Sequence, residues 1–342
     1  MLYGAIIKAR NVLYDKGAFK SSSLGVPTVS IGNITVGGTG KTPLVAFVAE
    51  ILAAQGEKVC ILTRGYGREN AKQRVLVSDS EQILAQPNKA GDEPFELAQK
   101  LLGKTVVVAD ANRVAAGNWA RKQFGITAFV LDDGFQHRKI KRELDIVLVD
   151  ATNPFGNGKL LPSGILREPL AHLKRADAIV ITRANLVDNL DNLKSQISDF
   201  SQNCSIFVSE NKVANLVNLK EFHAEAQSSQ STTDKEQKTK DKGLAFCALG
   251  NPNNFFEQLR REDFDLVSTE IFPDHHFYTP KDVAKIERKA NETGAKILLT
   301  TAKDAVKLKD KDFNLPCFVV ESELVFDDEI GFRNLLITVI EK

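Results

Sequence analysis

The chain has 342 residues, which is long enough to form two domains of ordinary size. Its 45 lysines and arginines nearly cancel its 44 aspartates and glutamates, so no overall basic charge favours nucleic acid as the main partner. The four cysteines lie far apart and form no metal-binding pattern, and no apolar run approaches the roughly 18 to 20 residues of a membrane span. Without a signal-peptide core at its N-terminus either, the protein is expected to stay in the cytoplasm.

The first residues, MLYGAIIKARNVLYDKGAFK, predict a short basic amphipathic helix. Leu2, Ile6, Ala9 and Leu13 recur at helical spacing, and lysine and arginine are available to a polar side. Such a helix either packs on its own domain or lies in an anionic membrane surface. The pattern alone leaves both interpretations open.

From residue 27 to about residue 185 the chain alternates short β-branched runs with glycine-rich or polar breaks and helical patterns. The runs are PTVSIG, KVCILT, TVVVAD, AFVLDD, DIVLVD and DAIVITR. Continuous apolar strands that alternate with helices predict a parallel sheet covered on both faces. Ligands of such α/β sheets bind at the carboxyl ends of the strands, where polar residues collect in this sequence.

A second, smaller α/β pattern follows residue 205. Its strand candidates are SIFVSE, GLAFCAL, KILLTT and CFVVES, and it closes with a helix in IGFRNLLITVIEK. Residues 223–243 between them lack large apolar side chains, which predicts a disordered polar insertion. We therefore expect an N-terminal helical segment (1–25), a P-loop NTPase-like domain (26–205) and a smaller α/β domain (206–342), with an interdomain cleft.

Residues 35–42, TVGGTGKT, are typical of a phosphate-binding loop in which Thr35 replaces the first glycine. The glycines let backbone N–H groups surround phosphate oxygens, Lys41 can reach the terminal phosphates, and the Thr42 hydroxyl can bind Mg²⁺. The following helix directs its positive end toward the phosphates. The expected nucleotide-binding residues are Thr35, Val36, Gly37, Gly38, Thr39, Gly40, Lys41 and Thr42.

A magnesium nucleotide also needs a carboxylate at the end of a neighbouring strand. Asp132 and Asp133 follow one predicted strand, and Asp150 at the end of another is a rival. A strand-end aspartate can instead serve a turn or cap a helix. The adjacent pair favours Asp132 and Asp133, which we expect to bind the metal together with Thr42.

Transfer of phosphate to an alcohol further requires a base and cations. Asp92 and Glu93 precede a predicted helix, where Asp92 is either the base or an ordinary N-cap. Asp274, His275 and His276 stand in one loop of the second half, and each has a structural interpretation as well. Four arginines in polar breaks could hold phosphate, although a solvated arginine is the default: Arg64, Arg113, Arg138 and Arg167.

An ordered set of motifs resembles the tetraacyldisaccharide 4'-kinase family of lipid A biosynthesis. The motifs are VSIGNITVGGTGKTP, LTRGYGR, GDEP, DANR, LDDGFQHR, LLPSGILREP, ITR, FCALGNPNNFFEQLR, FPDHHFY and LLTTAKDAVK. The resemblance implies transfer of the γ-phosphate of ATP to the 4'-hydroxyl of tetraacyldisaccharide 1-phosphate, which forms lipid IVA.

The resemblance also implies roles for single residues. The catalytic group is Asp92, His275, Asp132 and Asp133, where Asp92 is the base and His275 orients it after domain closure. The substrate-binding residues are Arg64, Tyr66, Glu93, Arg113, Gln136, His137 and Arg167. A substrate with four acyl chains stays in the bilayer, so the implied location is the cytoplasmic face of the bacterial inner membrane, with residues 1–25 on its surface and no obligate protein partner.

Two other P-loop classes compete with a kinase. A membrane-associated ATPase switch would carry a signature lysine directly before the two glycines, where this chain has Val36. A GTPase would carry an N/T-K-x-D motif, whereas here Lys303 directly precedes Asp304. Both classes predict hydrolysis without an acceptor.

Overall fold

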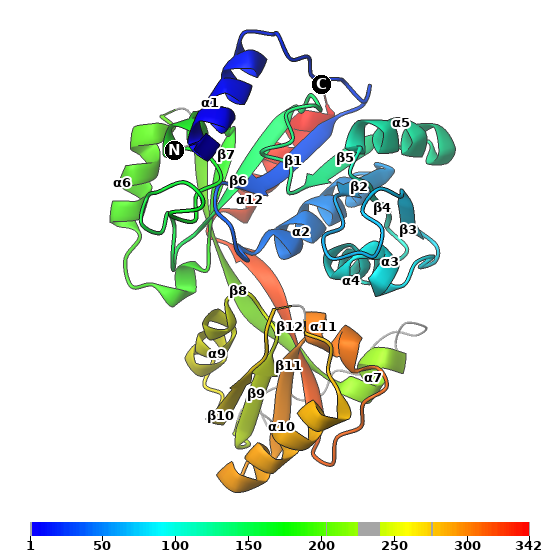
Figure 1. Ribbon diagram of the computed structural model, residues 1–342, viewed down its shortest axis with the longest axis vertical. Helices are drawn as coiled ribbons and strands as arrows, with labels where there is room; N and C mark the ends of the chain where they lie inside the picture. Colours follow the sequence, from blue (N-terminus) through cyan, green and yellow to red (C-terminus); the bar gives the residue numbers. More distant parts are fainter. Residues whose placement is uncertain (1, 203, 225–239, 275, 342) are drawn as a thin grey trace. The chain divides into compact units, whose positions relative to one another are not determined.

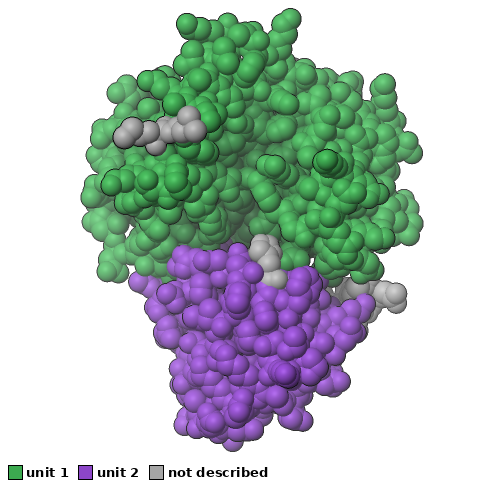
Figure 2. Space-filling view, in the orientation of Figure 1, with its two compact units in different colours: residues 1–210, 324–342 green, residues 211–323 purple. Residues whose placement is uncertain are grey.

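The computed structural model describes residues 2–202, 204–224, 240–274 and 276–341, which form two compact units. Unit 1 comprises residues 1–210 and 324–342, and unit 2 comprises residues 211–323 (Figure 2). Unit 2 is therefore inserted into the sequence of unit 1. Residues 324–342, which the sequence analysis assigned to the smaller domain, belong to unit 1, because their helix packs into its core.

Unit 1 is an α/β structure built on a mostly parallel sheet (Figure 1). Its strands run in the order β8-β7-β6-β1-β5-β2-β4-β3, and within this part only β3 is antiparallel to its neighbour. The strands are β1 (Thr28–Asn33), β2 (Val59–Thr63), β3 (Val75–Asp79), β4 (Thr105–Ala109), β5 (Ala128–Asp132), β6 (Leu144–Asp150), β7 (Ala178–Thr182) and β8 (Ser205–Asn218), which continues into unit 2. The structure confirms the predicted α/β class.

The helices of unit 1 are α1 (Leu2–Asp15), α2 (Lys41–Ala54), α3 (Pro87–Ala90), α4 (Asp92–Lys100), α5 (Arg113–Phe124), the 3-10 helices η1 (Leu170–Arg175) and η2 (Ala184–Leu186), α6 (Asp191–Phe200) and α12 (Glu329–Ile340). Most of them connect these strands, whereas α1 precedes β1 and α12 follows the last strand of the chain. None of the helices in the described residues is long and apolar enough to cross a membrane.

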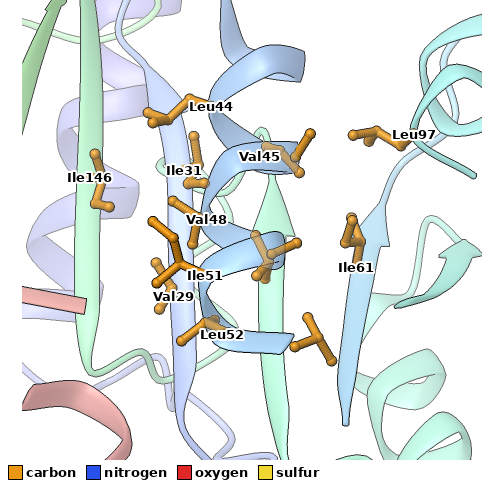
Figure 3. Packing of buried hydrophobic residues seen from close by; sticks show 14 of the residues in the cluster. Val29, Ile31, Leu44, Val45, Val48, Ile51, Leu52, Ile61, Leu97 and Ile146 are labelled. Atoms are coloured by element: carbon orange, nitrogen blue, oxygen red, sulfur yellow. The ribbon is translucent and has the colours of Figure 1, made fainter. Parts of the chain in front are cut away.

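The sheet of unit 1 is covered on both faces, as its continuous apolar strands predict. Alternate residues of β2 point to opposite sides, so Ile61 packs with α2 and α4, whereas Leu62 packs with α5. Helix α2 is the central cover of one face (Figure 3). Its residues Leu44, Val48 and Leu52 are fully buried. This packing fixes the phosphate-binding loop that precedes α2.

Unit 2 has its own sheet and core. Strands β9 (Gly243–Cys247), β10 (Leu266–Ile271), β11 (Ile297–Thr301) and β12 (Cys317–Phe326) follow the order β10-β9-β11-β12, and these neighbours pair in parallel. The helices are α7 (Leu219–Ala224), α9 (Pro252–Arg261), α10 (Pro280–Thr293), α11 (Ala302–Ala305) and the 3-10 helix η4 (Val306–Leu308). Helices α9 and α10 cover opposite faces.

The predicted insertion at residues 223–243 needs correction at its ends. Residues 223 and 224 complete α7, and Gly243 begins β9. Residues 225–239 lie outside the described residues. The insertion prediction was too wide because a polar composition does not mark where the flanking elements end.

Candidate active site

The phosphate-binding loop joins β1 to α2 in the predicted context. Gly37 and Gly40 have positive φ angles of 106° and 81°, which favour glycine, and residues 36–38 are exposed. Two hydrogen bonds hold Thr39 in the loop: Asn33 Nδ2 donates to its hydroxyl at 2.9 Å, and Thr182 Oγ1 donates to its carbonyl at 3.0 Å. The loop is therefore fixed at its base, while its glycines stay open.

Thr35, which replaces the first glycine of the pattern, does not have a positive φ angle and lies in a segment that pairs with another part of the chain. Thr35 bridges Leu166 in an antiparallel arrangement and is buried. On either side, the Val36 amide donates to the Ile165 carbonyl at 2.8 Å, and the Arg167 amide donates to the Ile34 carbonyl at 2.6 Å. The loop thus starts as a short ladder against residues 165–167, which brings Arg167 to the site.

Asp133 lies between cations of two segments. Arg167 Nη1 donates to both of its carboxylate oxygens, at 2.8 and 2.9 Å, and Lys41 Nζ lies 3.7 Å from Oδ1. Burial raises the pKa of Asp133, but Lys41 and Arg167 outweigh burial and hold this pKa below its usual value. Asp133 also has a positive φ of 51°, a conformation that non-glycine residues rarely adopt and that is enriched at functional sites.

Asp132 is buried at the end of β5, where the Thr63 hydroxyl donates to its carboxylate at 2.8 Å. Burial, followed by the negative charges of Glu93 and Asp133, raises its pKa to about 6, against the opposing charge of Lys41. Two neighbouring carboxylates, one with a raised and the other with a lowered pKa, are typical of a site that accepts a metal ion or a proton.

The turn after β5 holds Gln136 and His137 close to the same centre. Gln136 Nε2 donates to the Asn33 carbonyl at 2.9 Å. Arg142 ties the turn together: its Nη1 donates to the His137 carbonyl at 3.0 Å, and its Nε donates to Asp145 at 2.9 Å. Burial, then the charges of Arg113 and Arg142, lower the pKa of His137 to about 3, so its ring is neutral near pH 7.

Arg113 links the acidic pair to residues of another loop. This arginine begins α5, is buried, and donates from Nη1 to the Asp133 carbonyl at 3.1 Å. Burial lowers the pKa of Arg113 and outweighs the opposing effects of Asp132, Asp133 and Tyr66. Tyr66 is therefore close enough to influence the charge of Arg113. Arg64 lies over the Tyr66 ring at 5.2 Å. Arg64, in the loop after β2, and Arg113, at the start of α5, therefore lie near each other.

Helix α4 places Asp92 and Glu93 in its first turn. The N-cap is Gly91, with φ of 92°, so Asp92 is not the ordinary N-cap that one interpretation of the sequence required. A Cβ atom at Gly91 would lie 2.6 Å from the Tyr66 carbonyl, which shows how closely the loop after β2 packs on the start of α4. Glycine is therefore required where this loop and Asp92 meet.

Several other candidates have structural partners of their own. Asp150 pairs with Arg183, and Arg138 Nη2 contacts Asp15 of α1 at 2.8 Å. In unit 2, His276 Nε2 contacts Asp282 at 3.0 Å and its ring stacks on Phe272. Asp274 pairs with Lys303 at 3.1 Å. His275 lies outside the described residues, so its assigned role stays a prediction.

Sequence reasoning missed Asn33, Thr63 and Thr182. Each is a polar residue at the carboxyl end of a buried strand, and each binds a residue of the loop or of the acidic pair. Their position could have identified them in the sequence, because a polar side chain at the end of an apolar strand needs a hydrogen-bond partner.

The residues fit a nucleotide with its metal. The open glycines, the start of α2 and the cations Lys41 and Arg167 suit phosphate oxygens. Gln136 Oε1 and His137 Nε2 are buried without a hydrogen-bond partner among the described residues, as expected for groups that face a polar ligand. No cluster of three or more metal-binding side chains occurs in the described parts of the chain.

Comparison with known proteins identifies the family. The sequence profile described as "LpxK: Tetraacyldisaccharide-1-P 4'-kinase" matches residues 1–341. A tetraacyldisaccharide 4'-kinase of Halothermothrix orenii is 37% identical over 98% of this chain and 89% of its own length, and one of Geobacter metallireducens is 37% identical over 90% and 86%. The crystal structure of LpxK from Aquifex aeolicus in complex with ATP matches with a TM-score of 0.76 at 32% identity, over 99% of this chain and 96% of that chain. The chain therefore belongs to the tetraacyldisaccharide-1-P 4'-kinase family.

Proposed function

We infer that this protein is a kinase that transfers the γ-phosphate of ATP to the 4'-hydroxyl of tetraacyldisaccharide 1-phosphate, the step that forms lipid IVA. The carrying observation is a phosphate-binding loop whose Lys41 shares Asp133 with Arg167, in a chain that matches the kinase family from residue 1 to residue 341. No observation favours a switch ATPase without a lipid acceptor.

We assign the nucleotide to residues 35–42. The backbone of the loop and the start of α2 face the phosphates, and Lys41 neutralises charge on the terminal phosphate. Arg167 and Arg113 supply further positive charge where negative charge develops during transfer. Thr42, Asp132 and Asp133 would hold Mg²⁺, which neutralises phosphate charge when bound.

On the acceptor side we assign Asp92 as the base. It takes the proton of the 4'-hydroxyl as the oxygen of that hydroxyl forms a bond to the γ-phosphorus and ADP leaves. The polar residues assigned to the sugar and its 1-phosphate are Arg64, Tyr66, Glu93, Gln136 and His137. Neutral His137 can accept or donate a hydrogen bond without repelling the cations near it.

We further propose that α1 meets the surface of the inner membrane on its cytoplasmic side. Ile6 and Leu13 of α1 and the nearby Phe19 are exposed, at 57%, 38% and 45%. Exposed apolar side chains among lysines suit the interface of an anionic leaflet. The lipid acceptor would reach the kinase there.

The test is a phosphorylation assay with γ-labelled ATP, Mg²⁺ and tetraacyldisaccharide 1-phosphate in detergent micelles. We expect label in the lipid. Asp92→Ala should lower kcat about 100-fold or more with little change in KM for ATP, since general bases contribute about 10²- to 10⁴-fold. Lys41→Ala should impair ATP use directly.

Glu96→Ala, one turn further along α4, is the matched control for Asp92→Ala and should keep its turnover. Free phosphate without labelled lipid from the wild-type protein would refute the kinase assignment. Unchanged turnover in Asp92→Ala would leave the kinase assignment intact and remove this residue as its base.

A further inference from the structure

Glu168, which directly follows Arg167, is a buried carboxylate with no role in the proposed chemistry. It is 0% exposed. Its Oε2 is contacted by Asn11 Nδ2 at 2.7 Å, His172 Nδ1 at 2.7 Å and Arg175 Nη2 at 3.0 Å. Burying a carboxylate is costly unless several donors compensate it, so this cluster is an organised part of the fold.

The Glu168 cluster joins three segments of unit 1. Asn11 comes from α1, and His172 and Arg175 come from η1. The Arg175 guanidinium also lies 4.2 Å over the ring of Phe135, in the turn that follows Asp133. A single carboxylate therefore connects α1 to the two segments that carry Arg167 and the acidic turn.

Helix α1 makes further contacts with the same segments, among them two hydrogen bonds to the backbone. The Tyr3 hydroxyl donates to the carbonyl of Arg167 at 3.0 Å, and Arg10 Nη2 donates to the carbonyl of Gln136 at 3.2 Å. Both contacts hold the backbone of residues whose side chains belong to the candidate site. The inner face of α1 is thus packed on the site, separately from the exposed face that carries Ile6 and Leu13.

We propose that Glu168 is a positioning residue: together with Asn11 it fixes residues 166–175 against α1 and so keeps the Arg167 guanidinium on Asp133. The proposal rests on the proposed kinase function and gives α1 a second role that needs no membrane. Loss of the cluster shifts Arg167 away from Asp133, whereas the Thr39 contacts that hold the phosphate loop remain. Turnover should therefore fall more than ATP affinity.

The test is a double-mutant cycle on Glu168→Gln and Arg167→Lys, with kcat and KM measured in detergent micelles. Glutamine keeps the shape of Glu168 but removes the charge that pairs with Arg175. We expect Glu168→Gln to lower kcat about 10-fold or more with KM for ATP within about twofold. Once Arg167 is lysine, the added effect of Glu168→Gln should shrink at least fivefold, because coupled residues are not additive.

Asn11→Ala is the milder variant for the case in which Glu168→Gln does not fold, and it should lower kcat in the same direction. Lys174→Ala, at an exposed position of η1 between His172 and Arg175, is the control and should match the wild type. Unchanged kcat in folded Glu168→Gln or Asn11→Ala at 20 °C would overturn the proposal, as would full additivity with Arg167→Lys. A wild-type protein that labels no lipid would instead refute the kinase function itself.

Discussion

His137 shows how one residue couples the site to the stability of the fold. Burial and the neighbouring arginines lower its pKa to about 3, against about 6.5 in an unfolded chain. Between these values the unfolded chain binds a proton that the folded protein does not, so the free energy of unfolding decreases as the pH falls below about 6.5. Above that pH the full stability is present.

We therefore predict that His137→Gln loses less stability on acidification than the wild type. Between pH 7.5 and pH 5.0 the free energy of unfolding of the wild type should fall by about 2 kcal/mol more than that of the variant, since each pKa unit corresponds to about 1.4 kcal/mol. Urea unfolding at the two pH values measures it. A difference that stays constant with pH would mean that the His137 ring titrates normally in the folded protein.

A site residue could be predicted from the sequence where its function depends on residues next to it in the chain. Lys41 and Thr42 stand in a contiguous pattern, and Asp132 and Asp133 follow a recognisable strand. Glu168 could not be assigned in this way, because its partners Asn11 and Arg175 meet it only after folding. Whether a strand-end aspartate such as Asp150 faces a ligand or an arginine is likewise decided by the neighbouring loop.

At the scale of elements, one face of α1 packs on unit 1, as one interpretation of its amphipathic pattern required, and the membrane interpretation stays a prediction. Asn11 and Ile7 are buried against unit 1, and a Cβ atom at Gly4 would lie 2.8 Å from Leu160. Ile6 and Leu13 face outward on the same helix. Apolar periodicity could not separate the two faces, because the inner face is held largely by polar contacts.

This division predicts a separation of effects. Ile6→Ser combined with Leu13→Ser should weaken binding to anionic liposomes in a flotation assay by about 10-fold or more, with a change in stability within about 1 kcal/mol, because the lost area is exposed. Asn11→Ala should instead lower the Tm and leave liposome binding unchanged. If the double serine variant floats like the wild type, the membrane contact lies elsewhere.

The buried central strands could be predicted from the sequence, whereas the edge strands β3 of unit 1 and β10 of unit 2 could not. Continuous apolar runs with two buried faces, such as β2 and β6, appear in the sequence as strands. Strand β3 has mixed polarity and is antiparallel at the edge, and β10 is half-buried, so neither shows a clear period. An edge strand is not buried on both faces, so its sequence does not show the continuous apolar pattern by which a central strand is recognised.

At the scale of the whole molecule, the last helix of the chain completes the first unit. Phe332 of α12 is fully buried, stacks near Phe326 at 4.5 Å and meets Phe207 edge-on at 5.1 Å. The sequence placed this helix in the smaller domain because adjacency along the chain was its only guide. No local sequence pattern indicates that a helix packs on a domain formed by a much earlier part of the chain.

Phe332→Ala should therefore destabilise unit 1 by about 3 to 5 kcal/mol, the range for deleting a buried aromatic ring. Ile330→Ala, on the exposed side of the same helix at 76% exposure, should change stability by about 0.5 kcal/mol or less. Urea unfolding with and without ATP measures both. A small effect of Phe332→Ala would show that α12 contributes little to the core.

The return of α12 also has a consequence during synthesis. A ribosome releases the chain from its N-terminus, so α2 leaves it long before residues 326–340 exist to cover it. Unit 2 has all its residues, 211–323, before unit 1 does. Until residues 326–340 are made, part of the apolar surface of α2 stays uncovered, so we expect a nascent chain stopped before residue 324 to expose apolar surface that the whole chain buries.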